Sequence, residues 1–251
     1  MDLSLVSPAL LLAVFVAITL GALLKGMTGL GLPIFAVPAL AMITSVEEAV
    51  VLMVFPGIGA NLWLVISHRK YTILLRDHLP FLAAGFLGGL LGTWFLYAIS
   101  DRGLKIFLVI WLGLYLLTYF TNRSSLKFFG GKGLTAYPLG FAAGTIQGAS
   151  GISAQIVAPY YHVRGLTLRA YAFVTAFTFL LFSMAQVTAM VNFDLFTPER
   201  LQLSLFALVP TLIFTRVGIG LTGKISTSTF NRILLVTFIL MEAKLMMDIL
   251  R

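Results

Sequence analysis

The chain has 251 residues, of which 59% are hydrophobic and only 10% are charged, and its formal net charge is +8. A soluble domain carries about 25% charged residues, so the composition excludes a soluble protein and predicts an all-α, polytopic membrane protein. The Lys and Arg residues stand in short segments between apolar stretches, where they set orientation in the membrane, so the positive charge does not indicate nucleic-acid binding. The absence of cysteine excludes disulfides, thiolate metal sites and cysteine catalysis.

Charged and turn residues divide the apolar sequence into ten segments. In chain order we expect them at 3–25, 32–44, 46–67, 79–99, 103–120, 134–147, 153–162, 168–191, 201–222 and 228–250. Most are long enough to cross about 30 Å of hydrocarbon at about 1.5 Å per residue. Segments 32–44, 134–147 and 153–162 are too short to cross. The first segment lacks a basic leader and a small-residue cleavage site, so we expect it to be retained.

The two halves of the chain have a similar layout. The order of long and short segments approximately repeats, and Gly26 and Gly29 align with Gly148 and Gly151. This pattern predicts an internal duplication. We expect a first repeat at 1–120, a cytoplasmic linker at 121–133 and a second repeat at 134–251, all within one integrated membrane domain.

The distribution of Lys and Arg predicts the orientation of the segments. The basic residues expected on the cytoplasmic side are Arg69, Lys70, Arg76, Arg123, Lys127, Lys132, Arg164, Arg169 and Lys224. The opposite side carries fewer: Arg102, Lys105, Arg200 and Arg251. With these sides fixed, the first pair of segments enters and returns from outside, and the pair 134–147 and 153–162 does so from the cytoplasm. The two five-segment repeats are then inverted, with both termini outside the plasma membrane, which is the inner membrane in a bacterium.

Two glycine-containing breaks stand at corresponding places in the halves, at 26–33 and 148–155. Such paired breaks indicate the binding site of a transporter. We expect two hairpins with short helices, whose tips meet near the membrane midplane. The helices that begin after Gly31 and Gly151 would direct unpaired N–H groups and positive dipole ends to one point, which favours an anion.

A lysine immediately precedes the first break. Lys25 inside apolar sequence is a functional candidate by default; the alternative is a helix that ends near the inner surface, where the side chain would snorkel. Hydroxyl and amide groups near the breaks could add hydrogen bonds, although such residues also serve in helix–helix contacts. The candidate substrate-binding residues are Lys25, Gly26, Thr28, Gly29, Gly31, Gln147, Gly148, Ser150, Gly151, Ser153 and Gln155.

Other polar residues inside the segments give weaker signals. Asn61 and Gln186 lie mid-segment, and helix packing is the favoured role for both. Lys244 and Asp248 are spaced as a local ion pair. Glu242 is the only acidic residue deep enough to carry a coupling proton, although this role is not the favoured reading.

Motifs of the common hydrolases and nucleotide-binding enzymes are missing. The sequence contains no H-E-x-x-H, no G-x-S-x-G and no Walker A pattern. The histidines His68, His78 and His162 lie in loops or at segment ends. We therefore expect no enzymatic activity, no cofactor and no metal.

The pattern Gly26-x-x-Gly29-x-Gly31 followed by Pro38, its second copy Gly148-x-x-Gly151-x-Ser153 with Pro159, and the duplicated layout resemble the TauE/SafE family, also called the toluene-sulfonate uptake permease family. The resemblance covers nearly the whole chain. It implies a transporter of sulfite, sulfoacetate, other organosulfonates or related small acids. The sequence departs from the family in having Leu30 between glycines and Ser153 in place of a glycine.

Together these observations predict a secondary transporter of a small anion that works by alternating access. An anion channel and a non-transporting membrane assembly subunit are the alternatives. The expected partners are the anion and the lipid bilayer, while a coupling proton or cation and a homo-oligomer are left open.

Overall fold

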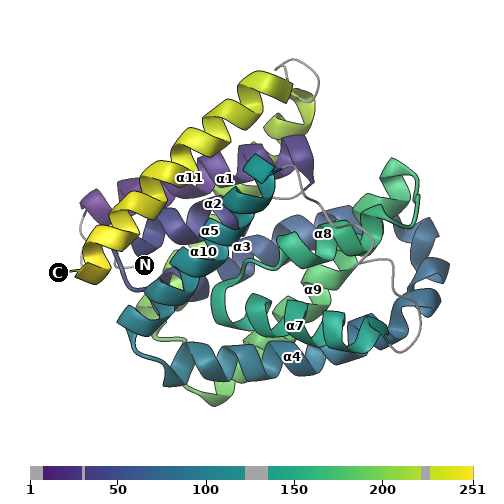
Figure 1. Ribbon diagram of the computed structural model, residues 1–251, viewed down its shortest axis with the longest axis horizontal. Helices are drawn as coiled ribbons and strands as arrows, with labels where there is room; N and C mark the ends of the chain where they lie inside the picture. The colour runs from purple at the N-terminus through teal and green to yellow at the C-terminus, as the bar shows by residue number, and fades with distance from the viewer. Residues whose placement is uncertain (1–7, 30–31, 122–134, 222–226, 251) are drawn as a thin grey trace.

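The computed structural model describes residues 8–29, 32–121, 135–221 and 227–250, and these form a bundle of helices without a strand (Figure 1). The elements are α1 (Pro8–Thr28), α2 (Leu32–Ala41), α3 (Val46–Ser67), η2 (Arg69–His78), α4 (Leu79–Ala98), α5 (Asp101–Thr121), α7 (Ala136–Ser150), α8 (Ala154–His162), α9 (Leu168–Asn192), α10 (Pro198–Leu221) and α11 (Thr227–Leu250).

The all-helical prediction is confirmed, and each of the ten apolar segments corresponds to one α-helix whose described ends lie within a few residues of the expected ones. Two details differ. The expected loop after Ser67 forms the 3₁₀-helix η2, which buries Leu75 and His78 against the bundle. α1 also continues past Lys25 to Thr28, so the lysine lies inside the last turn of a helix. The proposed linker at 121–133 falls almost entirely outside the described residues.

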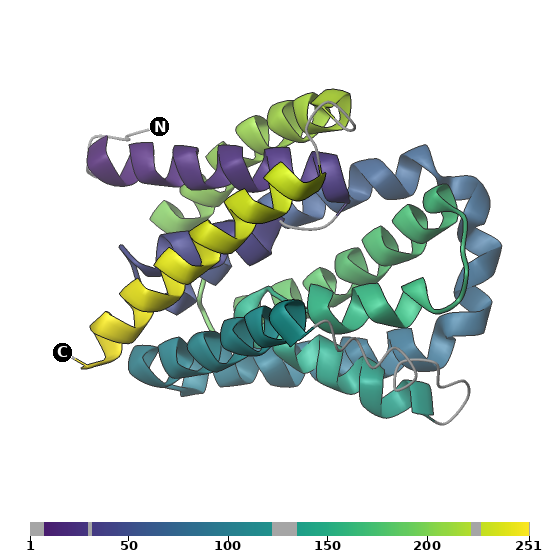
Figure 2. The same cartoon turned by 45° about the horizontal axis from the view of Figure 1, so that its top comes forward.

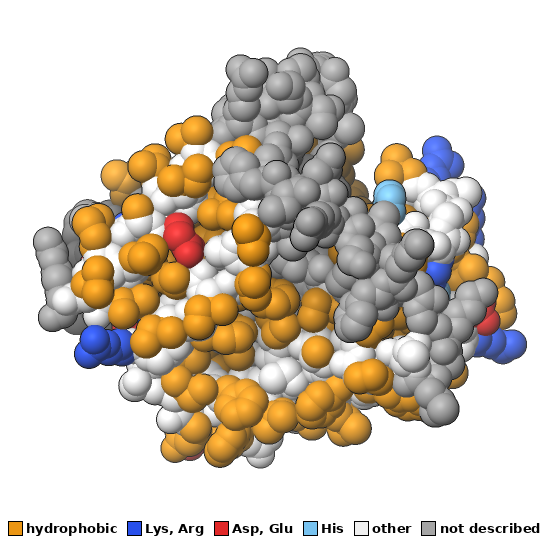
Figure 3. Space-filling view, in the orientation of Figure 1, with side chains coloured by type: hydrophobic (Ala, Val, Ile, Leu, Met, Phe, Trp, Pro, Cys, Tyr) orange, Lys and Arg blue, Asp and Glu red, His pale blue; other side chains and the backbone are white. Residues whose placement is uncertain are grey.

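Length and composition allow several of these helices to cross a membrane. Within the described ranges, the stretches that are long and apolar enough are Val46–Ser67, Arg69–Ala98, Leu168–Asn192 and Pro198–Leu221. Large apolar side chains cover much of the visible surface (Figure 3), and exposed examples such as Leu87, Leu168 and Val209 come from different helices. Exposed apolar side chains on several helices are suited to contact with lipid. The protein is a multi-pass membrane protein.

Polar caps define the ends of two central helices. The Ser45 hydroxyl accepts a hydrogen bond from the Glu48 backbone N–H at 3.1 Å, and Glu47 and Glu48 place negative charge in the first turn of α3. Thr167 caps α9 in the same way. Side-chain acceptors and acidic residues at a helix N-terminus stabilise it, so both helices begin where the sequence predicted.

The halves of the chain pack on each other reciprocally. α1 packs along α10, and α7 packs along α4, and these are the two most extensive helix contacts (Figures 1 and 2). Glycines bring the backbones together in both pairs: Gly26 faces Gly218, and Gly144 faces Gly85. The first helix of each half therefore packs on the fourth helix of the other.

Each short helix turns back along the helix before it. In the first half, Gly21 of α1 lies against Leu32 and Ala36 of α2. In the second half, the ring of Tyr160 near the end of α8 stacks on Phe81 with 3.8 Å between centroids. The backbone of Phe81 also lies against Gly140, near the start of α7. The pairs α1–α2 and α7–α8 are therefore hairpins, as the sequence predicted.

The bases of the two hairpins lie at opposite ends of α4, which is about 30 Å long. The second hairpin is fixed at the start of α4 through Phe81. The first hairpin is fixed near the other end of α4. There the N–H of Val46, which follows α2, donates to Oδ1 of Asp101, which follows α4, at 2.8 Å. The tips nevertheless touch, because a Cβ at Gly151 would lie 3.7 Å from Pro33 Cβ. Their depth relative to a membrane midplane stays a prediction.

Candidate functional site

The two breaks have the same backbone geometry. Gly29 has φ +76° and its N–H donates to the Lys25 carbonyl at 2.7 Å, while Gly151 has φ +71° and its N–H donates to the Gln147 carbonyl at 2.7 Å. A left-handed residue that bonds back in this way ends a helix, and glycine adopts this conformation without strain. Lys25 and Gln147 therefore occupy equivalent positions, each four residues before the glycine that ends its helix.

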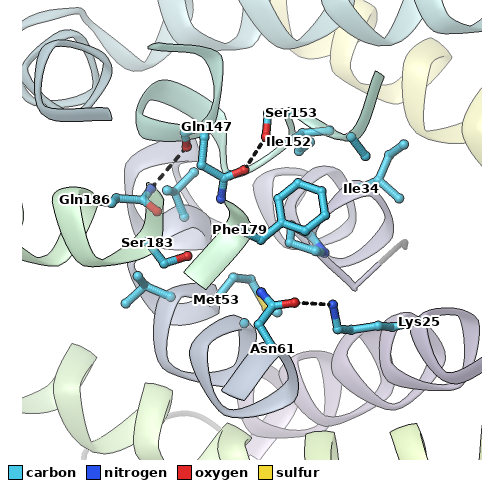
Figure 4. A pocket seen from close by; sticks show the side chains of 16 residues that line it. Lys25, Ile34, Met53, Asn61, Gln147, Ile152, Ser153, Phe179, Ser183 and Gln186 are labelled. Atoms are coloured by element: carbon cyan, nitrogen blue, oxygen red, sulfur yellow. Dashed lines mark hydrogen bonds between the residues drawn. The ribbon is translucent and has the colours of Figure 1, made fainter. Parts of the chain in front are cut away.

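A cavity of about 40 Å³ lies between the hairpin tips and two long helices (Figure 4). α3 and α9 supply two walls, and both hairpins supply the rest. The lining residues are Lys25, Pro33, Ile34, Val50, Met53, Val54, Gly57, Asn61, Gln147, Gly151, Ile152, Ser153, Ala154, Phe179, Ser183 and Gln186. The polar side chains among them are at most 5% exposed, so the polar groups of the site are buried.

Lys25 supplies the positive charge of the cavity. Its Nζ donates to Asn61 Oδ1 at 2.8 Å and lies 6.0 Å from the centroid of the Phe179 ring, at the limit of a cation–π contact. No acidic residue lines the cavity, and among the described residues Lys25 forms no ion pair. An amide oxygen satisfies one ammonium N–H but leaves the charge uncompensated.

Amide and hydroxyl groups face the cavity from the opposite side. The Ser153 hydroxyl donates to Gln147 Oε1 at 2.8 Å, which leaves the Gln147 amide N–H groups turned toward the centre (Figure 4). Gln186 Nε2 donates to the carbonyls of Gln147 and Gly148 at 3.3 and 3.2 Å, and so holds the end of α7. The Ser183 hydroxyl also points inward.

The Lys25–Asn61 bond fixes the orientation of the asparagine. Because an ammonium group only donates, the Asn61 oxygen must face it, and the Asn61 amide N–H groups must point away from Lys25. The cavity thus presents hydrogen-bond donors from Lys25, Asn61, Gln147 and Ser183. A set of donors with one net positive charge suits the oxygens of a small anion.

Several predicted residues lie away from the lining. Gly26 and Gly148 instead permit close helix contacts, with α10 and α4 respectively. The Ser150 hydroxyl donates to the Ile146 carbonyl and accepts from the Ile152 N–H, so it stabilises the break locally. Gln155 is off the cavity, and its buried amide atoms have no partner within the described ranges. The Thr28 side chain and Gly31 lie outside the described residues.

Three polar lining residues, Asn61, Ser183 and Gln186, were not among the predicted candidates. Asn61 and Gln186 carry polar amide groups in the middle of apolar helices. This polarity could have marked them as site residues, but the sequence favoured a role in helix packing. Ser183 gave no signal, because serine is common in membrane helices. All three belong to α3 or α9, which the sequence did not connect with the breaks.

The protein is a multi-pass helical bundle with a buried, positively charged cavity where two hairpins meet. These features are typical of membrane transporters with discontinuous helices. A family model described as Sulfite exporter TauE/SafE matches residues 13–245. The chain belongs to this family of transporters, as its glycine motifs predicted. No curated protein and no solved structure matches the chain.

Proposed function

We propose that the protein is a secondary transporter of small anions, with sulfite and small organosulfonates as its substrate class. The observation that carries this proposal is the buried Lys25 ammonium in a cavity without an acidic side chain. A buried charge is costly unless it is paired. An anion would supply the missing charge, and a cation would meet repulsion. The family description, a sulfite exporter, supports the same class.

The helix termini add to the positive potential. α2 and α8 both begin at the cavity, where Pro33 and Ser153 contribute to its lining. The N-terminus of a helix carries a partial positive charge and unpaired N–H groups. Lys25, Asn61 and Gln147 would then bind the anion's oxygens together with these termini.

The size of the cavity narrows the substrate. One buried water needs about 10–15 Å³ of such volume, so about 40 Å³ accommodates about three waters. This matches a compact oxyanion such as sulfite, which has one sulfur and three oxygens. A longer acid such as sulfoacetate would require the hairpin tips to separate, so we place sulfite first within the substrate class.

Burial of the site supports alternating access over an open channel. Lys25 and Gln147 are 4% and 5% exposed, so we expect the surrounding helices to move when an anion enters or leaves. The reciprocal packing of α1 on α10 and of α7 on α4, with hairpins based at opposite ends of α4, supports two inverted repeats. The part built on the α1–α10 pair would rock against the part built on the α7–α4 pair around the cavity. The basic loops would face the cytoplasm, with both termini outside the inner membrane.

Transport by purified protein in liposomes tests the proposal. We expect saturable uptake of sulfite, weaker uptake of sulfoacetate, and little uptake of plain carboxylates. Thiosulfate and taurine complete the panel, because taurine adds a positive charge that the Lys25 cavity would repel. Transport of a cation in place of all these anions would refute the proposal.

The same liposomes separate the two alternative functions. A carrier exchanges labelled for unlabelled sulfite across the membrane, whereas a channel shows no accelerated exchange. An assembly subunit would transport nothing on its own. The burial of Lys25 and Gln147 favours exchange.

A further inference from the structure

One acidic side chain, that of the half-buried Glu242, lies far from both ends of its helix. Glu242 stands on α11, eight residues before Leu250, or about 12 Å along the helix axis. Every other acidic residue in the described ranges lies in a connecting segment, in η2, or in the first or last turn of a helix. An ionisable residue at such depth in a membrane protein is costly and is a functional candidate by default.

No positive charge in the described chain compensates Glu242. Its Oε2 is buried and has no hydrogen-bond partner among the described residues. Its Oε1 lies against α5, where a Cβ added to Gly113 would be 3.3 Å away. Lys244, the nearest basic residue on α11, is paired with Asp248. The carboxyl group is therefore held against a helix backbone without a counter-ion.

The helices that pack on α11 bring no charge close to it. These are mainly α5 and, to a smaller extent, α2, which has no charged residue. The charged residues of α5 are Asp101, Arg102 and Lys105. Even the last of these is eight residues, or about 12 Å of helix, from Gly113, and Lys105 is paired with Asp101 at 2.9 Å. The same three helices form an apolar cluster that includes the chain neighbours of Gly113 and Glu242, and its buried members are Phe35, Leu112, Leu116, Phe238 and Met241.

α5 connects this carboxyl group with the cavity. Gly113 contacts Glu242, and two residues earlier the Trp111 indole N–H donates to the Ile152 carbonyl at 2.8 Å. Ile152 lines the cavity at the tip of the second hairpin. Residues two apart on an α-helix point about 200° apart. α5 therefore lies between Glu242 on one side and the hairpin tip on the other.

We propose that Glu242 is the proton-binding group that couples anion transport to proton movement. This inference rests on the proposed anion transport. The step is simple protonation: the carboxylate takes a proton from water and becomes a neutral carboxylic acid, and it later returns the proton. The neutral form fits the apolar contact with α5, whereas the carboxylate requires water, so α11 must shift away from Gly113 when the proton leaves. Trp111 would carry that shift to the hairpin tip.

Electrostatics gives the sign of the coupling. An anion in the cavity and a carboxylate at Glu242 are like charges in a medium of low dielectric constant, so each disfavours the other. A bound anion therefore favours the protonated form, and the protonated form binds the anion more tightly, because coupling is reciprocal. Proton and anion are expected to cross the membrane together.

The test uses methanesulfonate, which keeps one negative charge at every pH used and forms no membrane-permeant neutral acid. Purified protein in liposomes with an internal pH-sensitive dye is given external methanesulfonate, and labelled anion and proton entry are recorded together. The wild type is expected to move both. Glu242→Gln, which imitates the neutral form, is expected to keep anion binding and exchange but to lose the proton movement. Below the pH at which the Lys25 ammonium loses its proton, the Kd of Glu242→Gln should be independent of pH, while the wild-type Kd should rise with pH by up to tenfold per pH unit.

Two further variants control the result. Glu199→Gln makes the same change of charge on an exposed residue of α10 and should leave proton movement intact. Glu242→Asp keeps a proton-binding carboxyl group and should retain proton coupling. Loss of proton coupling in both Glu242→Gln and Glu242→Asp would indicate a packing role and overturn the inference. Proton entry equal to wild type in Glu242→Gln, or wild-type transport without protons, would also overturn it. If neither methanesulfonate nor sulfite enters, the proposed transport itself fails.

Discussion

Lys25 and Asn61 form the polar pair at the heart of the cavity. The amide oxygen at 2.8 Å from Nζ holds the ammonium in place without neutralising it. Replacement of this amide by a carboxylate would create an ion pair, and the net charge of the cavity would fall from positive to zero. The asparagine therefore orients the lysine while keeping its charge available to a substrate.

A charge change at Asn61 tests this reading. Asn61→Asp should abolish anion binding, because the new carboxylate would occupy the lysine and repel the anion. Asn61→Ala removes the amide but keeps the positive charge, so it should weaken binding by about 10- to 150-fold without abolishing it, since a hydrogen bond to a charged group contributes about 1.5–3 kcal/mol. Isothermal titration with sulfite compares the two variants. Equal affinities for Asp and Ala would show that charge is not what the cavity provides.

Gly57 gives a test of cavity size at the scale of one methyl group. A Cβ built on Gly57 meets no atom within 4 Å, and this glycine lines the cavity. Gly57→Ala should therefore fold normally, with a helix-propensity gain of about 1 kcal/mol, yet lose anion affinity because the methyl group fills the binding space. Gly220→Ala, which is equally open but lies away from the cavity, serves as the matched control. Unchanged sulfite affinity in Gly57→Ala would place the anion elsewhere.

At the scale of elements, the site depends on two helices that end in the same way. The left-handed residues Gly29 and Gly151 stop α1 and α7, so that Lys25 and Gln147 come to equivalent places on one cavity. α2 and α8 then begin at the cavity and turn back. The short helices are consequences of these two stops, and the position of each polar group follows from its distance to the stop.

Substitution of one stop residue should show this dependence. Gly29→Ala forces a side chain into the left-handed region at a cost of about 1–2 kcal/mol, although the Cβ itself meets nothing within 4 Å. Asparagine tolerates this conformation better, so Gly29→Asn should recover part of the loss. Thermal unfolding in detergent and sulfite uptake measure the effect. Equal stability of Gly29→Ala and wild type would mean that the break is not held in this conformation.

At the scale of the whole molecule, the two tight helix pairs determine which parts can move. Backbone contact at Gly26–Gly218 and Gly144–Gly85 joins α1 to α10 and α7 to α4. In the part of the chain that the structure describes, the hairpin tips approach each other at van der Waals distance near Gly151. Each pair joins one helix from each half of the chain, so relative motion should occur between the α1–α10 pair and the α7–α4 pair, at the hairpin tips and between α3 and α9, which are also walls of the cavity.

The orientation of the molecule can be tested directly, because the chain has no cysteine of its own. Asn192→Cys at the end of α9 should react with a membrane-impermeant maleimide in intact cells. Thr72→Cys in η2 should react only after permeabilisation. The reverse pattern would invert the proposed orientation, and labelling of both residues from outside would contradict the charge-based topology.

Much of this fold was predictable because its determinants are local. The length of each apolar segment and the charged residues at its ends fixed the helices to within a few residues, and the glycines marked both breaks. The cavity was only partly predictable. Lys25 and Gln147 adjoin the breaks, but Asn61 reaches Lys25 from 36 residues away through tertiary packing. Ser150 adjoins a break and still faces its own backbone, since the rotation of α7 decides where a side chain points.

The central claim is that the charge on Lys25 binds the transported anion. Titration of sulfite into purified wild type and Lys25→Ala tests it most directly, with thermal unfolding to verify that the variant is folded and with the exposed Lys70→Ala as control. Loss of a charge-assisted hydrogen bond of about 1.5–3 kcal/mol should weaken binding by about 10- to 150-fold and abolish uptake. A folded Lys25→Ala protein that binds and transports sulfite as the wild type does would contradict the account.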